Sequence, residues 1–203
     1  MKLYASAASS FARKIRVMLL EKGVEHELEI VNLWEPNQLH QTNPIGKVPA
    51  LRLGDGRVLV SSPLIADFVD GKYPQPRFIP GDFETRIEVR RWEALADGTM
   101  DAISATLYEI RFHEEAKRSL AWLDRQRKKF EGGFDALEAM LGGRRWCVGD
   151  GMTLADIAIG CHLGFLTLRA PHYFPRDRYP GLTRLWGRLE ERDSFKRTAP
   201  PAP

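Results

Sequence analysis

The chain has 203 residues, of which 43% are hydrophobic and 28% charged, with 30 Lys and Arg residues against 27 Asp and Glu. This composition fits one large folded domain or two small ones and excludes a disordered tail. The charges are spread along the chain without a basic block, so they favour neither nucleic acid nor a membrane surface as a partner.

The cysteine count and the N-terminal segment bear on the compartment. The only cysteines are Cys147 and Cys161, which are too few for a disulfide framework or for a metal site built on cysteine alone. No run approaches about 18 apolar residues, and the first ten residues lack the apolar core of a signal peptide. We therefore expect a cytoplasmic protein that has no membrane segment and holds no metal.

Residues 1–73 alternate between the strand period and the helix period. A short strand is predicted at Lys2–Tyr4, followed by a helix that starts after Ser9-Ser10 and ends near Gly23. A second strand is predicted at His26–Val31. The segment Asn32–Asn43 is expected to be irregular or to contain a short helix.

Two apolar runs, Val48–Leu53 and Val58–Val60, flank Gly54-Asp55-Gly56, which predicts a hairpin. Ser62 then stands where an N-cap residue would, directly before Pro63 in the first turn of another helix. A β-α-β unit implies parallel pairing and a hairpin implies antiparallel pairing. The order of elements therefore predicts a four-stranded mixed sheet covered by helices.

The second half has a different periodicity. From Glu84 onward the helical period dominates, with four apolar stripes that run from Ile87 to Ile110, Leu120 to Leu141, Leu154 to Leu168 and Leu182 to Leu189. The third stripe is the most apolar and predicts a central buried helix. We expect an α/β domain at residues 1–76, a proline-rich linker at 77–85 and an all-helical bundle at 86–203.

Two helix starts are candidates for anion binding. A hydroxyl of Ser9 or Ser10 at a helix N-terminus, beside unpaired N–H groups and the positive end of the helix dipole, favours an anion such as a thiolate. Ser61 and Ser62 offer a similar site for a carboxylate. The alternative at both places is ordinary N-capping.

A third candidate is the loop Asn43–Pro49, which leads directly into a strand. Pro49 cannot donate a hydrogen bond to a sheet, and a cis Val48–Pro49 bond would turn the N–H and C=O groups of Val48 outward. Those groups could then hold an extended peptide ligand as a neighbouring strand would. The alternative is a trans proline at the start of the strand.

Three segments together carry a family resemblance: Asn43-Pro-Ile-Gly-Lys-Val-Pro49-Ala-Leu51, Ser61-Ser-Pro-Leu-Ile65 and Thr153-Leu-Ala-Asp156. Over nearly its whole length the sequence resembles the cytosolic glutathione S-transferases, in particular bacterial members of the serine type with a zeta-like N-terminal motif. The resemblance implies a thioredoxin-like first domain, a helical second domain and a homodimer. It also implies glutathione as co-substrate and a small hydrophobic electrophile to which glutathione is conjugated. Thr153 and Asp156 form a capping box and are implied to serve folding.

The resemblance also implies roles for individual residues. Ser9, with Ser10 as its competitor, would donate its hydroxyl hydrogen to the glutathione thiolate. Val48 would pair with the cysteinyl backbone, Pro49 being the cis proline. Ser62 would bind the γ-glutamyl carboxylate. Three further residues are implied to line the glutathione site: Lys47, near the glycine carboxylate, Trp34, and Ser61, which replaces the usual acidic residue with a neutral hydroxyl.

The electrophile is expected between the two domains, beside four residues whose alternative role is packing: Phe11, Tyr108, Arg111 and Phe112. Two other functions stay open. Ser9-Ser10 followed by Arg13-Lys14-Ile15-Arg16 looks like the zeta class, which includes maleylacetoacetate isomerase, although Lys47 stands where that class usually has Gln. A non-catalytic interaction protein on the same fold is the other alternative, because a fold does not fix a function. A thiol mechanism is disfavoured because no cysteine precedes Cys147, and so is a metal site of His113 or His162 with Cys161.

Overall fold

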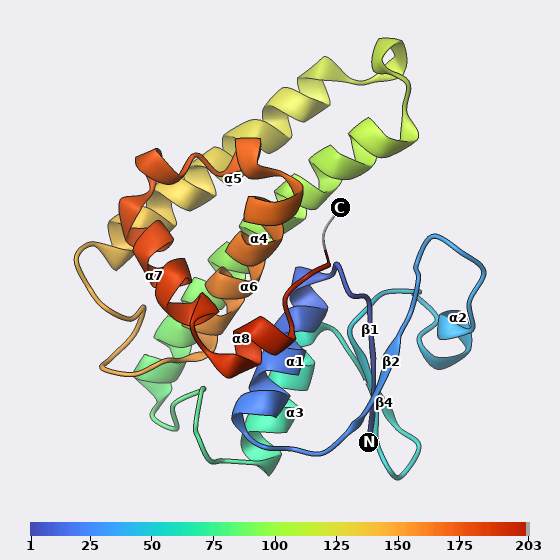
Figure 1. Cartoon of the computed structure of the whole chain (residues 1–203), viewed down its shortest axis with the longest axis vertical. Helices are drawn as coiled ribbons and strands as arrows, with labels where there is room; N and C mark the ends of the chain where they lie inside the picture. The colour runs from blue at the N-terminus through green and yellow to red at the C-terminus, as the bar shows by residue number, and fades with distance from the viewer. Residues whose placement is uncertain (202–203) are drawn as a thin grey trace.

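The computed structural model describes residues 1–201, and the chain forms a small sheet region followed by a helical region (Figure 1). The sheet region contains β1 (Lys2–Ala5), α1 (Ser10–Glu21), β2 (Glu27–Ile30), α2 (Leu39–Thr42), β3 (Ala50–Arg52), β4 (Val58–Val60) and α3 (Ser62–Lys72). The strand order is β2-β1-β3-β4, with β1 and β2 parallel and the other pairs antiparallel. This confirms the predicted four-stranded mixed sheet.

The helical region contains α4 (Phe83–Phe112), α5 (Leu120–Leu141), α6 (Leu154–Arg169), α7 (Pro180–Glu190) and α8 (Asp193–Arg197). Single 3₁₀ turns lie at Glu115–Lys117, Pro171–Tyr173 and Arg176–Arg178. The prediction of an all-helical second half is confirmed. Among residues 1–201, no helix has the length and apolar character that a membrane crossing requires.

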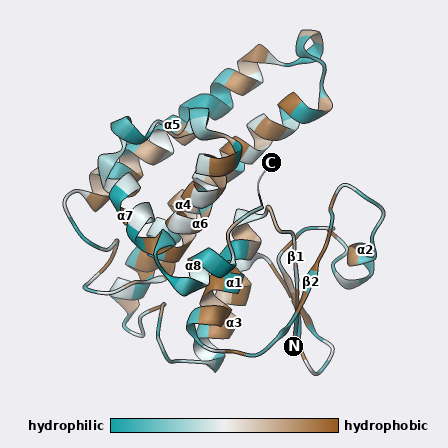
Figure 2. Cartoon of the chain, in the orientation of Figure 1, coloured by the Kyte–Doolittle hydropathy of each residue, from teal (hydrophilic) through white to brown (hydrophobic). Residues whose placement is uncertain are grey.

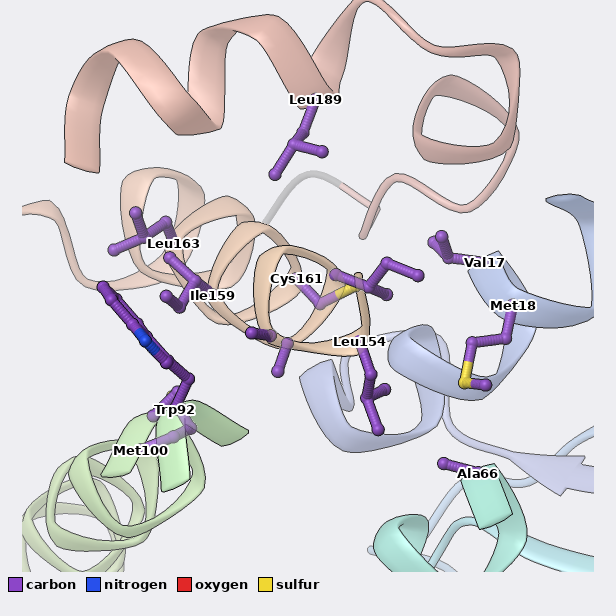
Figure 3. Packing of buried hydrophobic residues seen from close by; sticks show 14 of the residues in the cluster. Val17, Met18, Ala66, Trp92, Met100, Leu154, Ile159, Cys161, Leu163 and Leu189 are labelled. Carbon is purple, nitrogen blue, oxygen red and sulfur yellow. The ribbon is translucent and has the colours of Figure 1, made fainter. Parts of the chain in front are cut away.

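Helix α6 is the central helix, as its sequence predicts. It packs against α1, α4 and α7, and Figure 3 shows its Cys161 and Leu154 beside Val17 and Met18 of α1. Helices α1 and α3 lie between the sheet and the helical region, and both carry apolar residues there (Figure 2). One continuous apolar cluster therefore joins the two regions.

The chain between α3 and α4 is anchored by a buried carboxylate. Asp70 accepts hydrogen bonds from the backbone N–H groups of Phe78 (2.8 Å) and Ile79 (3.1 Å), and Lys22 Nζ lies 2.8 Å from it. The Phe78 carbonyl accepts from the N–H of Leu154 at the start of α6. These contacts fix the path of the chain from the sheet to the helices.

Some local expectations are wrong. Helix α3 starts at Ser62, so its N-cap is Ser61, which makes no side-chain cap bond. Strand β3 begins at Ala50, after Pro49, and is shorter than the apolar run. Several residues of the predicted apolar stripes and strands are exposed because their faces have no neighbour in a single chain, namely Leu28, Ile30, Leu64, Ile87, Ile110, Leu120 and Leu168.

The start of α6 rests on the fully buried Asp156. Its Oδ2 accepts hydrogen bonds from N and Oγ1 of Thr153, both at 2.8 Å, and its Oδ1 accepts from the N–H of Cys147 at 2.8 Å. The carboxylate thus closes the capping box and also ties down the chain before it. This geometry supports a folding role for Thr153 and Asp156.

Asp156→Ala should lower the free energy of unfolding by about 3 kcal/mol, because three buried donors lose their acceptor. Urea denaturation followed by circular dichroism measures the change. The matched control is Asp82→Ala, which removes the exposed N-cap of α4 that accepts from Thr85 N, at a cost of about 1 kcal/mol. Equal losses in the two variants would contradict the assigned role of Asp156.

Candidate functional site

Three segments meet at one end of the sheet because of the strand register. Tyr4 at the end of β1 is opposite Ala50 at the start of β3, and Ala50 is opposite Val60 at the end of β4. The chain leaving β1 leads to Ser9, the chain entering β3 comes from Val48-Pro49, and the chain leaving β4 leads to Ser61-Ser62. The candidate residues of the first region therefore share one edge of the sheet.

Ser9 is the N-cap of α1. Its Oγ accepts a hydrogen bond from the N–H of Ala12 at 3.2 Å, and its side chain is only half-buried. As an acceptor in this bond, the hydroxyl keeps its hydrogen available for another partner. Ser9 thus combines a capping role with the ability to donate to an anion at the helix N-terminus.

Ser10 lies in a different environment. It is 4% exposed, and its Oγ lies 2.9 Å from Nδ1 of His162 on α6. Nε2 of the same ring lies 2.9 Å from Oδ1 of Asp97 on α4. The two serines are therefore distinguished by tertiary contacts, since Ser10 is bound to the helical region.

The contacts of Asp97 extend into a buried ionic network. Lys14 Nζ donates to Asp97 (2.8 Å) and to Glu93 (2.7 Å), and Arg90 pairs with Glu93 and with Asp67 of α3. Burial opposes the ionisation of Asp97, but its hydrogen bond with His162 and the charge of Lys14 outweigh it, so its pKa lies below the usual value. Asp97 is therefore ionised at neutral pH.

The loop before β3 is held by a buried asparagine. Nδ2 of Asn43 donates to the Lys47 carbonyl at 2.7 Å, and its Oδ1 accepts from the N–H of Ile45 at 3.3 Å. The Val48–Pro49 bond is cis, and Val48 lies beyond the paired part of the β1–β3 ladder, which ends at Ala50.

The start of α3 has an unusual backbone. Ser61 has φ of 74°, in the left-handed region that non-glycine residues rarely occupy and that costs about 1–3 kcal/mol. Ser61 is exposed, whereas Ser62 is 3% exposed at the first position of α3. Strain of this kind is often retained at binding sites.

One face of α4 lies on the side of the sheet region. Asp97, Asp101, Tyr108 and Phe112 follow each other at spacings that place them on one side of the helix. Asp97 reaches α1 through His162. Burial and the charge of Asp97 raise the pKa of Asp101, while the charges of Lys47 and Lys14 act in the opposite direction.

The far end of that face carries an exposed aromatic group. Trp34 lies 6.0 Å from the ring of Tyr108 and 5.6 Å from that of Phe112, and the Arg111 guanidinium is 4.2 Å from the Trp34 centroid. All three rings are more than half exposed. From the sequence, Trp34 was expected to line the glutathione site, and Tyr108, Arg111 and Phe112 the electrophile site. The structure brings these four side chains together. Phe11 lies apart, half-buried, with its ring 5.0 Å from that of His162.

Both cysteines are inaccessible. Cys161 is fully buried beside α1 (Figure 3), and burial raises the pKa of its thiol to about 12. Burial and the neighbouring Asp156 carboxylate raise the pKa of Cys147 still further. Within residues 1–201, no group of three or more His, Cys, Asp or Glu side chains is arranged to hold a metal.

Sequence reasoning missed Asp97, Glu93 and the buried Lys14, and considered His162 only as a metal ligand. The sequence did contain a signal for buried polar partners. Ser10 and Lys14 are four residues apart, so they lie on one face of a helix that is expected to be next to the second domain. Polar side chains at such positions need partners when the helix is covered on both sides.

Comparisons with known proteins agree with this geometry. The family model described as "Glutathione S-transferase, N-terminal domain" matches residues 8–72, and "Glutathione S-transferase, C-terminal domain" matches residues 121–185. The GST-like protein YibF of Escherichia coli K12, described as uncharacterized, is 39% identical over 204 residues and 99% of both chains. A maleylacetoacetate isomerase of Pseudomonas aeruginosa is 26% identical over 198 residues, which cover 93% of this chain and 87% of that protein.

Among solved structures, a glutathione S-transferase of Methylobacillus flagellatus KT with glutathione bound superposes with a TM-score of 0.94. It is 41% identical and the match covers 98% of this chain and 99% of that one. The chain therefore belongs to the glutathione S-transferase family, and the resemblance seen in the sequence is confirmed.

The environment of the two thiols predicts their reactivity. Because a thiolate is the reactive form, neither Cys147 nor Cys161 should react with iodoacetamide in the native protein at pH about 8, and both should react after unfolding in urea. Mass spectrometry of the intact protein measures the modification. A native protein that takes up one label rapidly would contradict the buried placement.

Proposed function

We propose that this protein binds glutathione at the end of the sheet and conjugates its thiol to a small electrophile. The observation that carries the proposal is the strand register, which brings Ser9, Val48-Pro49 and Ser62 to one edge. A helix N-terminus, a free strand-like backbone and a second helix N-terminus then meet there. These three features suit a thiolate, a peptide backbone and a carboxylate, which glutathione contains.

Each part of glutathione has a proposed partner. The N–H and C=O groups of Val48 pair with the cysteinyl backbone, and Ser62 with the N-terminus of α3 binds the γ-glutamyl carboxylate. Ser61 offers a neutral hydroxyl to the γ-glutamyl amine. Lys47, exposed at the end of its loop, attracts the glycine carboxylate.

The thiolate is assigned to Ser9. A free thiol has a pKa near 8.5, and lowering it by about two units takes roughly 2.7 kcal/mol of selective stabilisation. One hydrogen bond to the charged sulfur contributes about 1.5–3 kcal/mol, and the helix terminus adds about 0.3–1 kcal/mol. Ser9 therefore stabilises the thiolate without acting as a base or as a nucleophile.

Ser9→Ala should raise the pKa of the bound glutathione thiol by about 1–2 units and lower kcat/KM at neutral pH about 10- to 100-fold. Ultraviolet difference absorption of the thiolate and conjugation of chlorodinitrobenzene measure the two effects.

The matched control for Ser9 is Ser119→Ala. Ser119 caps α5 by accepting from Trp122 N at 3.2 Å, the same arrangement as at α1. This control should lose about 1 kcal/mol of stability and keep the wild-type thiol pKa. If Ser9→Ala also keeps that pKa, the assignment of Ser9 is wrong.

The electrophile site is proposed at Trp34, Tyr108 and Phe112, with Phe11 on the side toward Ser9. These exposed rings come from both regions of the chain and contact each other in edge-on or tilted orientations beside α4. Arg111 covers one face of Trp34. An apolar or aromatic electrophile gains contact area on such rings.

Isomerisation is a second candidate function, favoured by the match to a maleylacetoacetate isomerase and by the Ser9-Ser10 pair. Glutathione would then add to a double bond and leave again. Measured isomerisation of maleylacetoacetate, with no stable conjugate formed, would support it over net conjugation. Failure of the protein to bind glutathione in calorimetry would instead favour a non-catalytic interaction protein.

A homodimer is proposed through α3 and the start of α4. Leu64, Phe83 and Ile87 are exposed by 50%, 70% and 48%, and ion pairs from Asp67 to Arg86 and Arg90 hold the two helices side by side. Exposed apolar groups of this kind commonly mark association surfaces. The surface combines the sheet region with the helical region.

Phe83→Glu should convert the dimer to a monomer, because a charge would be buried in the apolar contact. Size-exclusion chromatography with light scattering measures the mass. Leu120→Glu is the matched control, since Leu120 is also the first residue of a helix and is 77% exposed. The assignment fails if both variants remain dimers.

A further inference from the structure

His162 joins three helices at the start of α1. Its ring contacts two consecutive residues of α1, with Nδ1 2.9 Å from Ser10 Oγ and the ring centroid 5.0 Å from that of Phe11. Its other nitrogen contacts Asp97 of α4. The ring is 4% exposed, so these contacts are shielded from water.

One hydrogen-bond direction follows from the charge of Asp97. Ionised Asp97 can only accept, so Nε2 of His162 carries a hydrogen. Nδ1 lies against Ser10 Oγ, which accepts from an imidazolium and donates to a neutral ring. In both cases the Ser10 hydroxyl is buried against His162, which leaves Ser9 as the accessible hydroxyl at the start of the helix.

We infer that His162 is a positioning residue that holds the first turn of α1 so that the Ser9 hydroxyl, and not that of Ser10, meets the glutathione sulfur. This inference rests on the proposed function. The Ser9 side chain bonds to Ala12 of its own helix, and the next two residues connect this turn to α6 through His162. The helical region thus takes part in stabilising the thiolate through the contact between Ser10 and His162.

Two substitutions of His162 test its two hydrogen bonds separately, the bond of Nδ1 with Ser10 and the bond of Nε2 with Asp97. The amide of Asn can replace Nδ1 and that of Gln can replace Nε2. His162→Gln therefore keeps a partner for Asp97 and loses Ser10, whereas His162→Asn keeps Ser10 and loses Asp97. Ser10→Ala also removes the bond between Ser10 and His162, but it deletes only the serine hydroxyl and leaves the histidine ring in place.

The readout is the pKa of the bound glutathione thiol, from ultraviolet difference spectra of the full-length protein. We expect His162→Gln and Ser10→Ala each to raise it by about 0.5–1 unit, and the double variant to show no further rise because both changes break one bond. His162→Asn should restore a value close to wild type. His26→Gln is the control, because His26 follows the other end of α1.

The outcomes separate the inference from the proposed function. If Ser9→Ala raises the thiol pKa but Ser10→Ala and His162→Gln leave it at the wild-type value, the inference is overturned and the proposed function stands. If wild-type protein does not lower the thiol pKa at all, both are overturned. Should His162→Gln fail to fold, Ser10→Ala decides the question alone.

Discussion

Helix α1 is covered by the sheet region on one side and by α6 on the other. The side toward the helical region nevertheless carries polar and charged side chains. Burying an ionised group without a partner costs several kcal/mol, so these side chains must be paired. Lys14 is fully buried between Glu93 and Asp97 of α4. Arg13 reaches Glu190 of α7 at 2.9 Å. The partners come from the helical region, so folding of one region is completed by the other.

This pairing also determines the geometry of the site. The N-terminus of α1 carries Ser9 and the facing side of α4 carries Tyr108 and Phe112. Because Lys14 and Asp97 tie the two helices together, the space between them has a defined width. Buried polar contacts are directional, whereas apolar contacts tolerate sliding. The network therefore fixes the N-terminus of α1 relative to α4 through directional contacts.

Much of the fold follows from local sequence signals. The change of period near residue 80, the hairpin at Gly54-Asp55-Gly56 and the capping box at Thr153 predict elements that the structure contains. The strand register then brings Ser9, Val48 and Ser62 to one edge, which the order of elements made foreseeable. The errors are local and have local causes. The N-cap of α3 is Ser61 and not the predicted Ser62, because Ser61 has the non-helical backbone.

The sequence by itself determined the family, the two kinds of secondary structure and the short list of candidate hydroxyls, because these depend on periodicity and on residues close in the chain. It could not choose between Ser9 and Ser10, which are adjacent and chemically identical. Only the tertiary structure distinguishes their environments, because Ser10 contacts His162, which lies 152 residues further along the chain. Packing of α6 against α1 occupies one hydroxyl and leaves the other half-exposed, and no local pattern encodes that contact.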